Sequence, residues 1–325
     1  MLKDLFTINK RFLGKTDIAV TPIGLGVMQM SGGAGFFGRA FPVLSQAEKT
    51  ELVKAALEGG INWFDTAEVY GFGLSERSLA QALQTLDKKP GEVVIATKWW
   101  PMFRTARNIP RSIGIRLQNL HPYPIDLYYI HQPFSFSSPE AEMNAMAALV
   151  EGGKIRSIGV SNFNAKRMRR AYQALAERGL KLAANQVEYS LVHRQIESDG
   201  TLETAQELGV TIVAYTPLGY GLLTGVFHKD PSRLKEKNPF FRRGIERRLE
   251  ASRNLVETME AIGQRYGATP GQVALNWLIN RHGDSVVAIP GATKVSQVQQ
   301  AAGTMQFTLD AGELEEIDRL SQQFR

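Results

Sequence analysis

Three side chains that can hold charge or exchange a proton recur at even intervals in the first half of the chain. Asp65, Lys98 and His131 each follow a short apolar segment, and 33 residues separate each of them from the next. A carboxylate, an ammonium group and an imidazole gathered at one site could carry out acid–base chemistry. The even spacing indicates that one structural unit repeats between them.

The later apolar segments also end in polar or aromatic residues. At these ends lie Ser161 and Asn162, then Asn185 and Gln186, then Tyr215, and finally Pro290 and Gly291. In a barrel of parallel strands the chemistry is carried out at the carboxyl ends of the strands. We therefore expect seven successive segments to deliver functional groups to the same rim.

The elements that must position these residues are short apolar runs alternating with amphipathic stretches. The predicted strands are an early one near residues 19–26, followed by 61–64, 93–97, 127–130, 157–160, 183–187, 211–215 and 286–289. The predicted helices include 45–58, 75–86, 110–120, 140–151, 165–178 and 202–208. Apolar runs of this kind are typical of strands buried on both faces. Eight such units without a break in composition predict a single-domain (β/α)8 TIM barrel spanning residues 1–325.

A glycine motif argues for a different fold. Gly33, Gly35 and Gly38 fit the GxGxxG pattern of dinucleotide-binding folds, which requires a helix that opens on the last glycine. Here the next helix begins only at Ser45, where Ser45 and Glu48 form a capping box. We therefore reject a Rossmann fold and expect a mobile loop at the barrel mouth. Its aromatic residues, Phe36 and Phe37, are expected to line a substrate pocket.

Composition excludes several classes of function. The chain has no Cys and five scattered His, which removes disulfides, thiol nucleophiles and cysteine-based zinc sites and predicts no metal centre. The first residues lack the apolar core of a signal peptide, and no run approaches the ~20 apolar residues of a membrane span. We expect a cytoplasmic protein that does not bind membranes.

The positive charge is concentrated between Lys229 and Arg253. This stretch holds nine Lys and Arg against four Asp and Glu, whereas the whole chain carries a net charge of +6. A solvated loop is the favoured interpretation, and a flap over an anionic ligand is the second. Nucleic-acid binding is the third and least favoured, because only Phe240 and Phe241 interrupt the charges as aromatic residues.

Several segments together resemble the aldo-keto reductases. The matching segments are GINWFDTAEVYG, VVIATKWW, IDLYYIHQP, EGGKIRSIGVSNF, NQVEYS, VAYTPLGYGLLTG and IPGATK, in family order over about residues 17–321. The resemblance, which points to bacterial members related to the potassium-channel β subunits, implies a (β/α)8 barrel. It also implies NADPH (NADP+) as cofactor, bound without a Rossmann fold, and a small-molecule carbonyl substrate. The basic stretch then becomes a loop that folds over the cofactor.

The resemblance places the family's four catalytic residues on Asp65, Tyr70, Lys98 and His131. Hydride that reaches a carbonyl carbon leaves negative charge on the oxygen, and Tyr70 would donate the proton that neutralises it. A phenol with a pKa of ~10 needs its anion stabilised, which the Lys98 ammonium would provide. Asp65 would hold Lys98, and His131 would bind the substrate oxygen.

The resemblance also assigns the cofactor contacts. Ser161, Asn162 and Gln186 would bind the nicotinamide carboxamide, and the ring of Tyr215 would stack under the nicotinamide. The remaining assigned residues are Thr216, Pro217, Leu218, Gly219 and Gly221 for the pyrophosphate, and Gly291, Thr293, Lys294 and Gln297 after the eighth strand. Thr293 and Lys294 would meet the 2′-phosphate of NADPH. The sequence departs from the family at Gln300 and Ala301, where many relatives carry the acid and Asn that hold the adenine.

Two matters stay open from the sequence. The leading function is carbonyl reduction, and the alternative is a cofactor-sensing or regulatory barrel with slow turnover. Among the aromatic residues, Trp63 and Phe64 are expected in the core, whereas either Trp99 or Trp100 could form a wall of the substrate pocket. The sequence does not indicate an oligomeric state.

Overall fold

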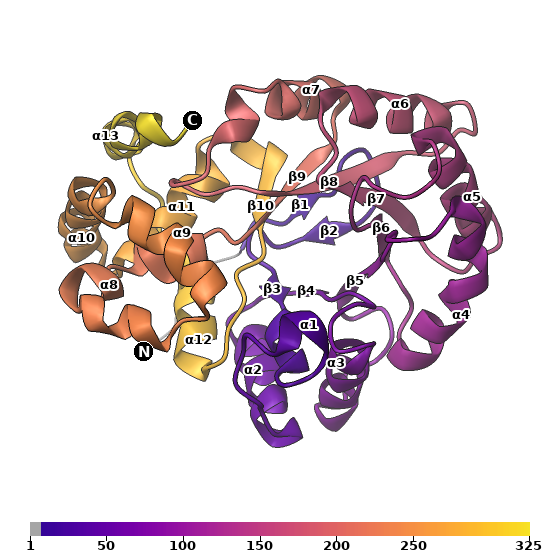
Figure 1. The fold of residues 1–325 in the computed structure, drawn as a ribbon, viewed down its shortest axis with the longest axis horizontal. Coiled ribbons are helices and arrows are strands. Elements are labelled where there is room, and N and C mark those ends of the chain that lie inside the picture. Colours follow the sequence, from indigo (N-terminus) through magenta and orange to yellow (C-terminus); the bar gives the residue numbers. More distant parts are fainter. Residues whose placement is uncertain (1–7) are drawn as a thin grey trace.

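Eight short parallel strands curl into a barrel at the centre of the molecule (Figure 1). In order around the barrel they are β3 (Leu25–Gly26), β4 (Trp63–Asp65), β5 (Val94–Trp99), β6 (Leu127–Ile130), β7 (Ser157–Ser161), β8 (Leu182–Glu188), β9 (Thr211–Tyr215) and β10 (Val286–Ala288). Parallel bridges from Ile23 to Ala288 and from Gly26 to Gly291 join the first strand to the last. The computed structural model, which describes residues 8–325, thus confirms the predicted (β/α)8 barrel.

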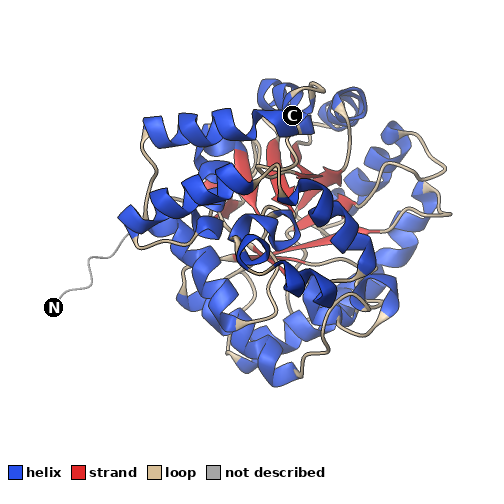
Figure 2. Cartoon of the chain, turned by 60° about the vertical axis from the view of Figure 1, so that its left-hand side comes forward, coloured by secondary structure: helices blue, strands red, loops and turns tan. Residues whose placement is uncertain are grey.

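A helix follows each strand and packs on the outside of the barrel (Figure 2). These helices are α2 (Gln46–Glu58), α3 (Leu74–Thr85), α4 (Ile109–Leu120), α5 (Pro139–Glu151), α6 (Ala165–Ala176), α7 (Thr201–Leu208), α11 (Pro270–Asn280) and α12 (Val295–Gly303). The predicted capping box is present, because the Ser45 hydroxyl accepts the backbone N–H of Glu48 while the Glu48 carboxylate accepts that of Ser45. All six predicted helices are observed.

The core has two layers. One lies between the strands and the helices, and the other fills the inside of the barrel with the side chains of Trp63, Tyr129 and Val213, among others. The inner layer continues into an antiparallel hairpin of β1 (Arg11–Phe12) and β2 (Ala19–Val20), whose Leu13 and Ile18 pack into the amino-terminal end of the barrel.

The early strand predicted near residues 19–26 is in fact two separate strands. Ala19–Val20 belongs to the hairpin β1–β2, whereas Leu25–Gly26 is the first barrel strand. Pro22 lies between them and carries no backbone N–H, so one continuous strand would lose a hydrogen bond there.

The stretch after β9 is helical rather than the long loop that the sequence predicted. It contains α8 (Val226–Lys229), α9 (Pro239–Leu249) and α10 (Arg253–Tyr266). Pro239 occupies the first position of α9, where a missing N–H costs nothing. Within α9, Ile245 is buried whereas Arg243 and Arg247 are exposed. This amphipathic arrangement explains how so basic a segment folds.

The remaining elements complete the chain. α1 (Gly35–Gly38) forms one turn within the glycine motif, and α13 (Ala311–Ser321) packs against α10 near the carboxyl terminus. Across the part of the chain that the structure describes, no helix is both long enough and apolar enough to span a bilayer.

Candidate active site

Three adjacent strands bring the first predicted residues together at the carboxyl end of the barrel. Asp65 is the last residue of β4, Lys98 lies near the end of β5, and His131 directly follows β6. The ammonium group of Lys98 forms an ion pair with the Asp65 carboxylate and also donates to the carbonyl oxygen of Thr66 at 2.8 Å. The side chains of Lys98 and Asp65 are 0% and 2% exposed, so this charge pair lies inside the protein.

Tyr70 reaches the same point from the loop between β4 and α3. Its ring centre lies 5.3 Å from Nζ of Lys98 and 5.7 Å from the imidazole ring of His131, which it meets edge-on. The loop is held down at its far end, where Ser75 accepts a hydrogen bond from Thr66 and donates one to the carbonyl oxygen of Val27. The four catalytic residues predicted in the sequence analysis are therefore neighbours in the structure.

Burial sets the protonation of the four groups. It raises the pKa of Tyr70 well above its usual value, and the charge of Asp65 raises it further. Burial also lowers the pKa of His131 well below its usual value, and the nearby Lys98 ammonium acts in the same direction. At neutral pH the site therefore presents a protonated phenol and a neutral imidazole.

The pKa of Tyr70 shifts in the opposite direction to the one that the sequence led us to expect. The sequence led us to expect the Lys98 ammonium to stabilise the tyrosinate, but the net pKa of Tyr70 is raised. The structure gives the reason, since Lys98 pairs directly with Asp65 while the half-buried Tyr70 is partly desolvated. Burial likewise lowers the pKa of Lys98 and raises that of Asp65, and the attraction within the pair opposes both shifts.

The residues assigned to the nicotinamide lie around this centre and contact one another. Asn162 donates to the Ser161 hydroxyl at 3.2 Å and accepts from the Tyr215 hydroxyl at 3.0 Å. Gln186 is buried, and its amide donates to Asp65 at 2.9 Å. The sequence did not reveal this last bond, which connects the proposed carboxamide site to the Lys98–Asp65 ion pair.

The segment assigned to the pyrophosphate forms a tight, irregular turn after β9. Thr216, Gly219 and Gly221 have left-handed backbone torsions, with φ of 52°, 56° and 97°. Pro217 and Leu218 lie between the first two of these residues. A Cβ at Gly219 would lie 2.6 Å from Val192, so this close approach requires glycine. The turn can expose backbone N–H groups to an anion, as its assignment requires.

The residues after β10 form the start of α12. Gln297 accepts the backbone N–H groups of Thr293 and Lys294 at 2.8 and 3.2 Å, which leaves the Lys294 side chain exposed. Gly291 approaches Gln29, because a Cβ there would lie 2.1 Å from the Gln29 amide nitrogen. Oε1 of Gln29 is buried, and no partner for it is found among the described residues. Gln29 is thus a further polar residue at this edge, and nothing in its sequence context indicated it.

A largely buried ionic cluster, centred on Glu68 in the loop that carries Tyr70, is the main feature that the sequence reasoning missed. Glu68 accepts the backbone N–H of Trp100 at 2.6 Å and forms ion pairs with Arg104 and Arg116. Arg116 also pairs with Glu76 at 2.8 Å. The signal was present, since Glu68 is the one charged residue between Asp65 and Tyr70. The cluster connects the loop that carries Tyr70 to the loop after β5.

The structure distinguishes the two neighbouring tryptophans. Trp99 is fully buried, and its indole N–H donates to Asn108 at 2.9 Å, so it belongs to the core. Trp100 meets the His131 ring edge-on at 5.2 Å and forms a wall of the site. Phe36 is highly exposed on α1, whereas the side chain of Phe37 lies outside the described part of the structure.

Comparison with known proteins identifies the family. The sequence model of the Aldo/keto reductase family matches residues 22–322. The chain belongs to this family. This aldo/keto reductase is 33% identical over 316 residues to an aldo-keto reductase of Strobilurus tenacellus, with 94% of this chain and 90% of the relative covered. It is 35% identical over 311 residues to an uncharacterised oxidoreductase of Mycobacterium tuberculosis, with 94% and 91% covered.

Solved structures agree with this assignment. A thermostable aldo-keto reductase crystallised with the inhibitor epalrestat superposes with a TM-score of 0.78 at 31% identity, covering 96% of this chain and 99% of that one. An aldo-keto reductase of Klebsiella pneumoniae in complex with NADPH superposes with a TM-score of 0.73 at 26% identity, covering 97% and 96%. The chain is therefore an oxidoreductase of a family whose cofactor is NADP(H).

The polar residues around the barrel rim fit this cofactor. The amide and hydroxyl groups of Ser161 and Asn162 can both donate and accept, as a neutral carboxamide requires. The partnerless Oε1 of Gln29 is a further polar atom available to a ligand. Within the described residues, no group of three or more His, Cys, Asp and Glu side chains is arranged to hold a metal ion.

Proposed function

We propose that this protein is an NADPH-dependent carbonyl reductase that converts aldehydes or ketones to alcohols, with Tyr70 as the general acid. The observation that carries the proposal is the meeting of Tyr70 and His131 above the buried Lys98–Asp65 ion pair. This arrangement places a proton donor, a neutral hydrogen-bonding ring and a positive charge around one point.

The chemistry requires these three groups. When bound, NADPH supplies the hydride that reduces the carbonyl carbon. Tyr70 donates its proton to the carbonyl oxygen, and the raised pKa of its phenol ensures that the proton is present at neutral pH. His131 contributes a hydrogen bond from a neutral ring, because burial lowers its pKa. Lys98 stabilises the negative charge that remains on Tyr70 after proton transfer.

The remaining rim residues would hold the cofactor. Ser161, Asn162 and Gln186 would fix the carboxamide, and Tyr215 would support the nicotinamide ring from a position where its hydroxyl orients Asn162. The backbone from Thr216 to Gly221 would take the pyrophosphate. Thr293 and Lys294 would meet the 2′-phosphate, and Gln297 orders their backbone as a cap of α12.

The decisive test is Tyr70→Phe, assayed by NADPH oxidation with a good aldehyde substrate. The lost hydroxyl acts on the developing alkoxide, so turnover should fall by ~10²–10⁴-fold, whereas the dissociation constant for NADPH should stay within about twofold. Tyr172→Phe on α6, outside the site, is the matched control and should keep full activity. If Tyr70→Phe kept more than about a third of the wild-type turnover, Tyr70 would not be the acid.

The cofactor-sensing role makes a different kinetic prediction. A sensor holds NADP(H) for much longer than one catalytic cycle, so cofactor release, measured by stopped-flow fluorescence, would limit turnover for every aldehyde. A carbonyl reductase should instead show turnover that varies with the aldehyde. A single common rate for all substrates would favour the sensing role.

A further inference from the structure

Large exposed apolar side chains gather at one end of the barrel. Eight of the ten that the described residues contain lie in connections that follow barrel strands: Phe36, Val43, Phe72, Met102, Phe103, Phe134, Phe136 and Tyr220. These loops follow β3, β4, β5, β6 and β9 and form the mouth above the catalytic residues. Single exposed apolar residues are ordinary, but a concentration around one opening marks a binding surface.

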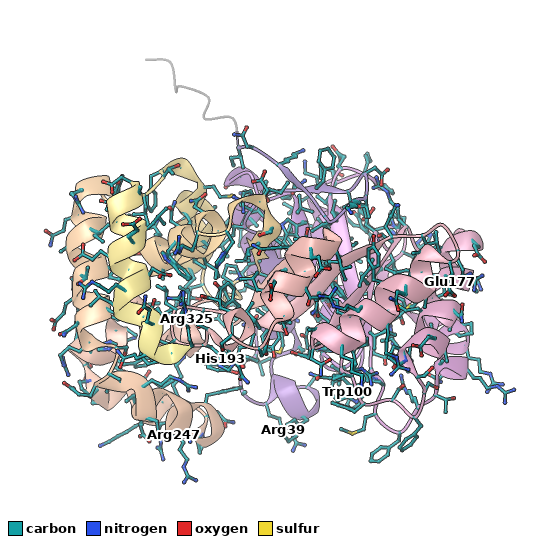
Figure 3. All side chains as sticks on the ribbon, turned by 90° about the horizontal axis from the view of Figure 1, so that it is seen from above. Arg39, Trp100, Glu177, His193, Arg247 and Arg325 are labelled. Atoms are coloured by element: carbon teal, nitrogen blue, oxygen red, sulfur yellow. The ribbon has the colours of Figure 1, made fainter. Side chains whose placement is uncertain are left out.

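A series of neighbouring aromatic rings extends outward from Tyr70. The Tyr70 and His131 rings lie 5.7 Å apart, those of His131 and Trp100 5.2 Å, and those of Trp100 and Phe134 5.8 Å. Figure 3 shows Trp100 on the same face of the molecule as Arg39 and Arg247. An apolar molecule with its carbonyl at Tyr70 would therefore lie against aromatic side chains along its length.

A second aromatic pair continues this surface. Phe103 and Phe136 lie 6.5 Å apart and are 82% and 70% exposed. A hydrogen bond of 2.9 Å from the Phe136 backbone N–H to the Arg104 carbonyl oxygen joins their two loops. We refer to Trp100, Phe103, Phe134 and Phe136 as the aromatic rim.

Three aromatic residues of the mouth have an unfavourable backbone conformation. Six non-glycine residues in the described chain have left-handed torsions, and three of them are aromatic residues of the mouth: Phe72, Phe103 and Tyr220, with φ of 52°, 57° and 58°. Bulky residues avoid this conformation, and the rings of Phe72 and Phe103, which are 78% and 82% exposed, gain little packing in return, whereas Tyr220 stacks on Phe241. Stability of the fold therefore does not explain the placement of Phe72 and Phe103, whereas binding at the mouth does.

The ionic cluster beside Trp100 is neutralised internally. Arg104 pairs with Glu68, and Arg116 shares Glu68 with it while also pairing with Glu76. The wall beside Trp100 thus has no spare charge from this cluster with which to attract an ionic group. Such a wall favours an uncharged, apolar ligand over an anion or a sugar acid.

We propose that the aromatic rim selects bulky, uncharged carbonyl substrates that carry an aromatic or extended apolar group. The carbonyl lies at Tyr70 and His131, and the apolar group lies against Trp100, Phe103, Phe134 and Phe136. This inference rests on the proposed carbonyl-reductase function. It assigns the role of specificity residues to side chains that take no part in proton transfer.

The test compares aldehydes that share one reacting group. Benzaldehyde, 4-phenylbenzaldehyde and 4-carboxybenzaldehyde differ only in what extends from the ring toward the rim. The second ring should raise kcat/KM at least tenfold over benzaldehyde, mainly through KM, because it removes apolar surface from water. The carboxylate should give no such gain. Equal kcat/KM values for the three aldehydes would overturn the proposal.

Substitutions in the aromatic rim test whether its side chains cause the preference for 4-phenylbenzaldehyde. Phe103→Ser and Phe136→Ser should abolish the tenfold preference and leave kcat/KM for benzaldehyde within twofold of the wild type. Phe12→Ser is the matched control, because Phe12 is 62% exposed on β1 at the opposite end of the barrel, and it should change neither value. A preference that survives in both rim variants would refute the assignment.

Two further results have separate meanings. If the wild-type protein reduced none of the three aldehydes nor a small one such as methylglyoxal, the proposed function itself would fail. If size-exclusion chromatography showed that the rim variants dissociate a wild-type oligomer, the aromatic rim would be a protein interface. That result would overturn the substrate assignment and leave the carbonyl-reductase function standing.

Discussion

Removing the Lys98 ammonium should reveal how strongly the barrel interior depends on charge pairing. In Lys98→Met the Asp65 carboxylate stays buried, and its remaining side-chain partner is the Gln186 amide at 2.9 Å. Breaking a buried ion pair by deleting one partner costs about 3–5 kcal/mol, since the other charge is left without compensation. At roughly 2 °C per kcal/mol for a protein of this size, Tm should fall by roughly 6–10 °C at pH 8.

The loss should depend on pH with a definite sign. Burial already raises the pKa of Asp65, while Lys98 opposes that shift, so deleting Lys98 raises this pKa further. A carboxyl group whose pKa is higher in the folded state than in the unfolded state stabilises the fold when protonated and loses that contribution as the pH rises. The Tm deficit of Lys98→Met should therefore shrink when the pH is lowered from 8 to 5.

The assay is thermal unfolding followed by tryptophan fluorescence at pH 5, 6, 7 and 8, with wild type, Lys98→Met and Asp65→Asn/Lys98→Met in parallel. The double variant replaces the ion pair with neutral groups and should be more stable than Lys98→Met at pH 8. NADPH oxidation should be severely reduced in both variants. If Lys98→Met melted at the wild-type temperature across this range, or if the double variant were less stable than the single one, the buried-pair reasoning would be wrong.

Two other predictions concern the edges of the site. Lys294→Ala should raise the KM for NADPH at least several-fold and leave NADH use almost unchanged, with a smaller effect at high salt, and equal losses for both cofactors would refute a 2′-phosphate contact. Glu68→Gln should raise the KM for the aldehyde several-fold more than it lowers kcat, because the amide can still accept the Trp100 N–H but cannot pair with Arg104. Its pH profile should match the wild type, with exposed Glu92→Gln as the control, and a shifted profile would instead place Glu68 in the proton transfer.

The sequence predicted the barrel and the gathering of Asp65, Lys98 and His131 because both depend on local, repeating features, whereas Tyr70 was assigned by the family resemblance. Asp65, Lys98 and His131 sit at the ends of apolar runs spaced by one βα unit, so parallel pairing alone brings them to one rim. The rim contacts among Ser161, Asn162 and Tyr215 follow from the same logic, although the hydrogen bonds between them could not be predicted.

The features that the sequence did not predict depend on contacts between segments that are far apart in the chain and are not related by the βα repeat. Glu68 meets Arg104 and Arg116, which lie 36 and 48 residues further along, in a loop and on the inner face of α4. The helix α9 was missed because the charge between Lys229 and Arg253 indicated a solvated loop, whereas burial of Ile245 in the hydrophobic core offsets the poor helix propensity of Gly244. The upward pKa shift of Tyr70 required knowledge of its burial, which residue type does not give.

The hairpin β1–β2 closes the barrel at its amino-terminal end. Leu13 and Ile18 fill its amino-terminal end, and Arg11 fastens the hairpin to the carbonyl oxygen of Val286 at 2.6 Å. We therefore expect reactants to reach Lys98 over the loops at the opposite end, and products to leave by the same route. Two ligands that enter through the same opening obstruct each other, so the ligand that binds deeper should bind first and be released last. We therefore expect an ordered sequence of binding and release that follows from the shape of the barrel and does not depend on the affinity of either ligand.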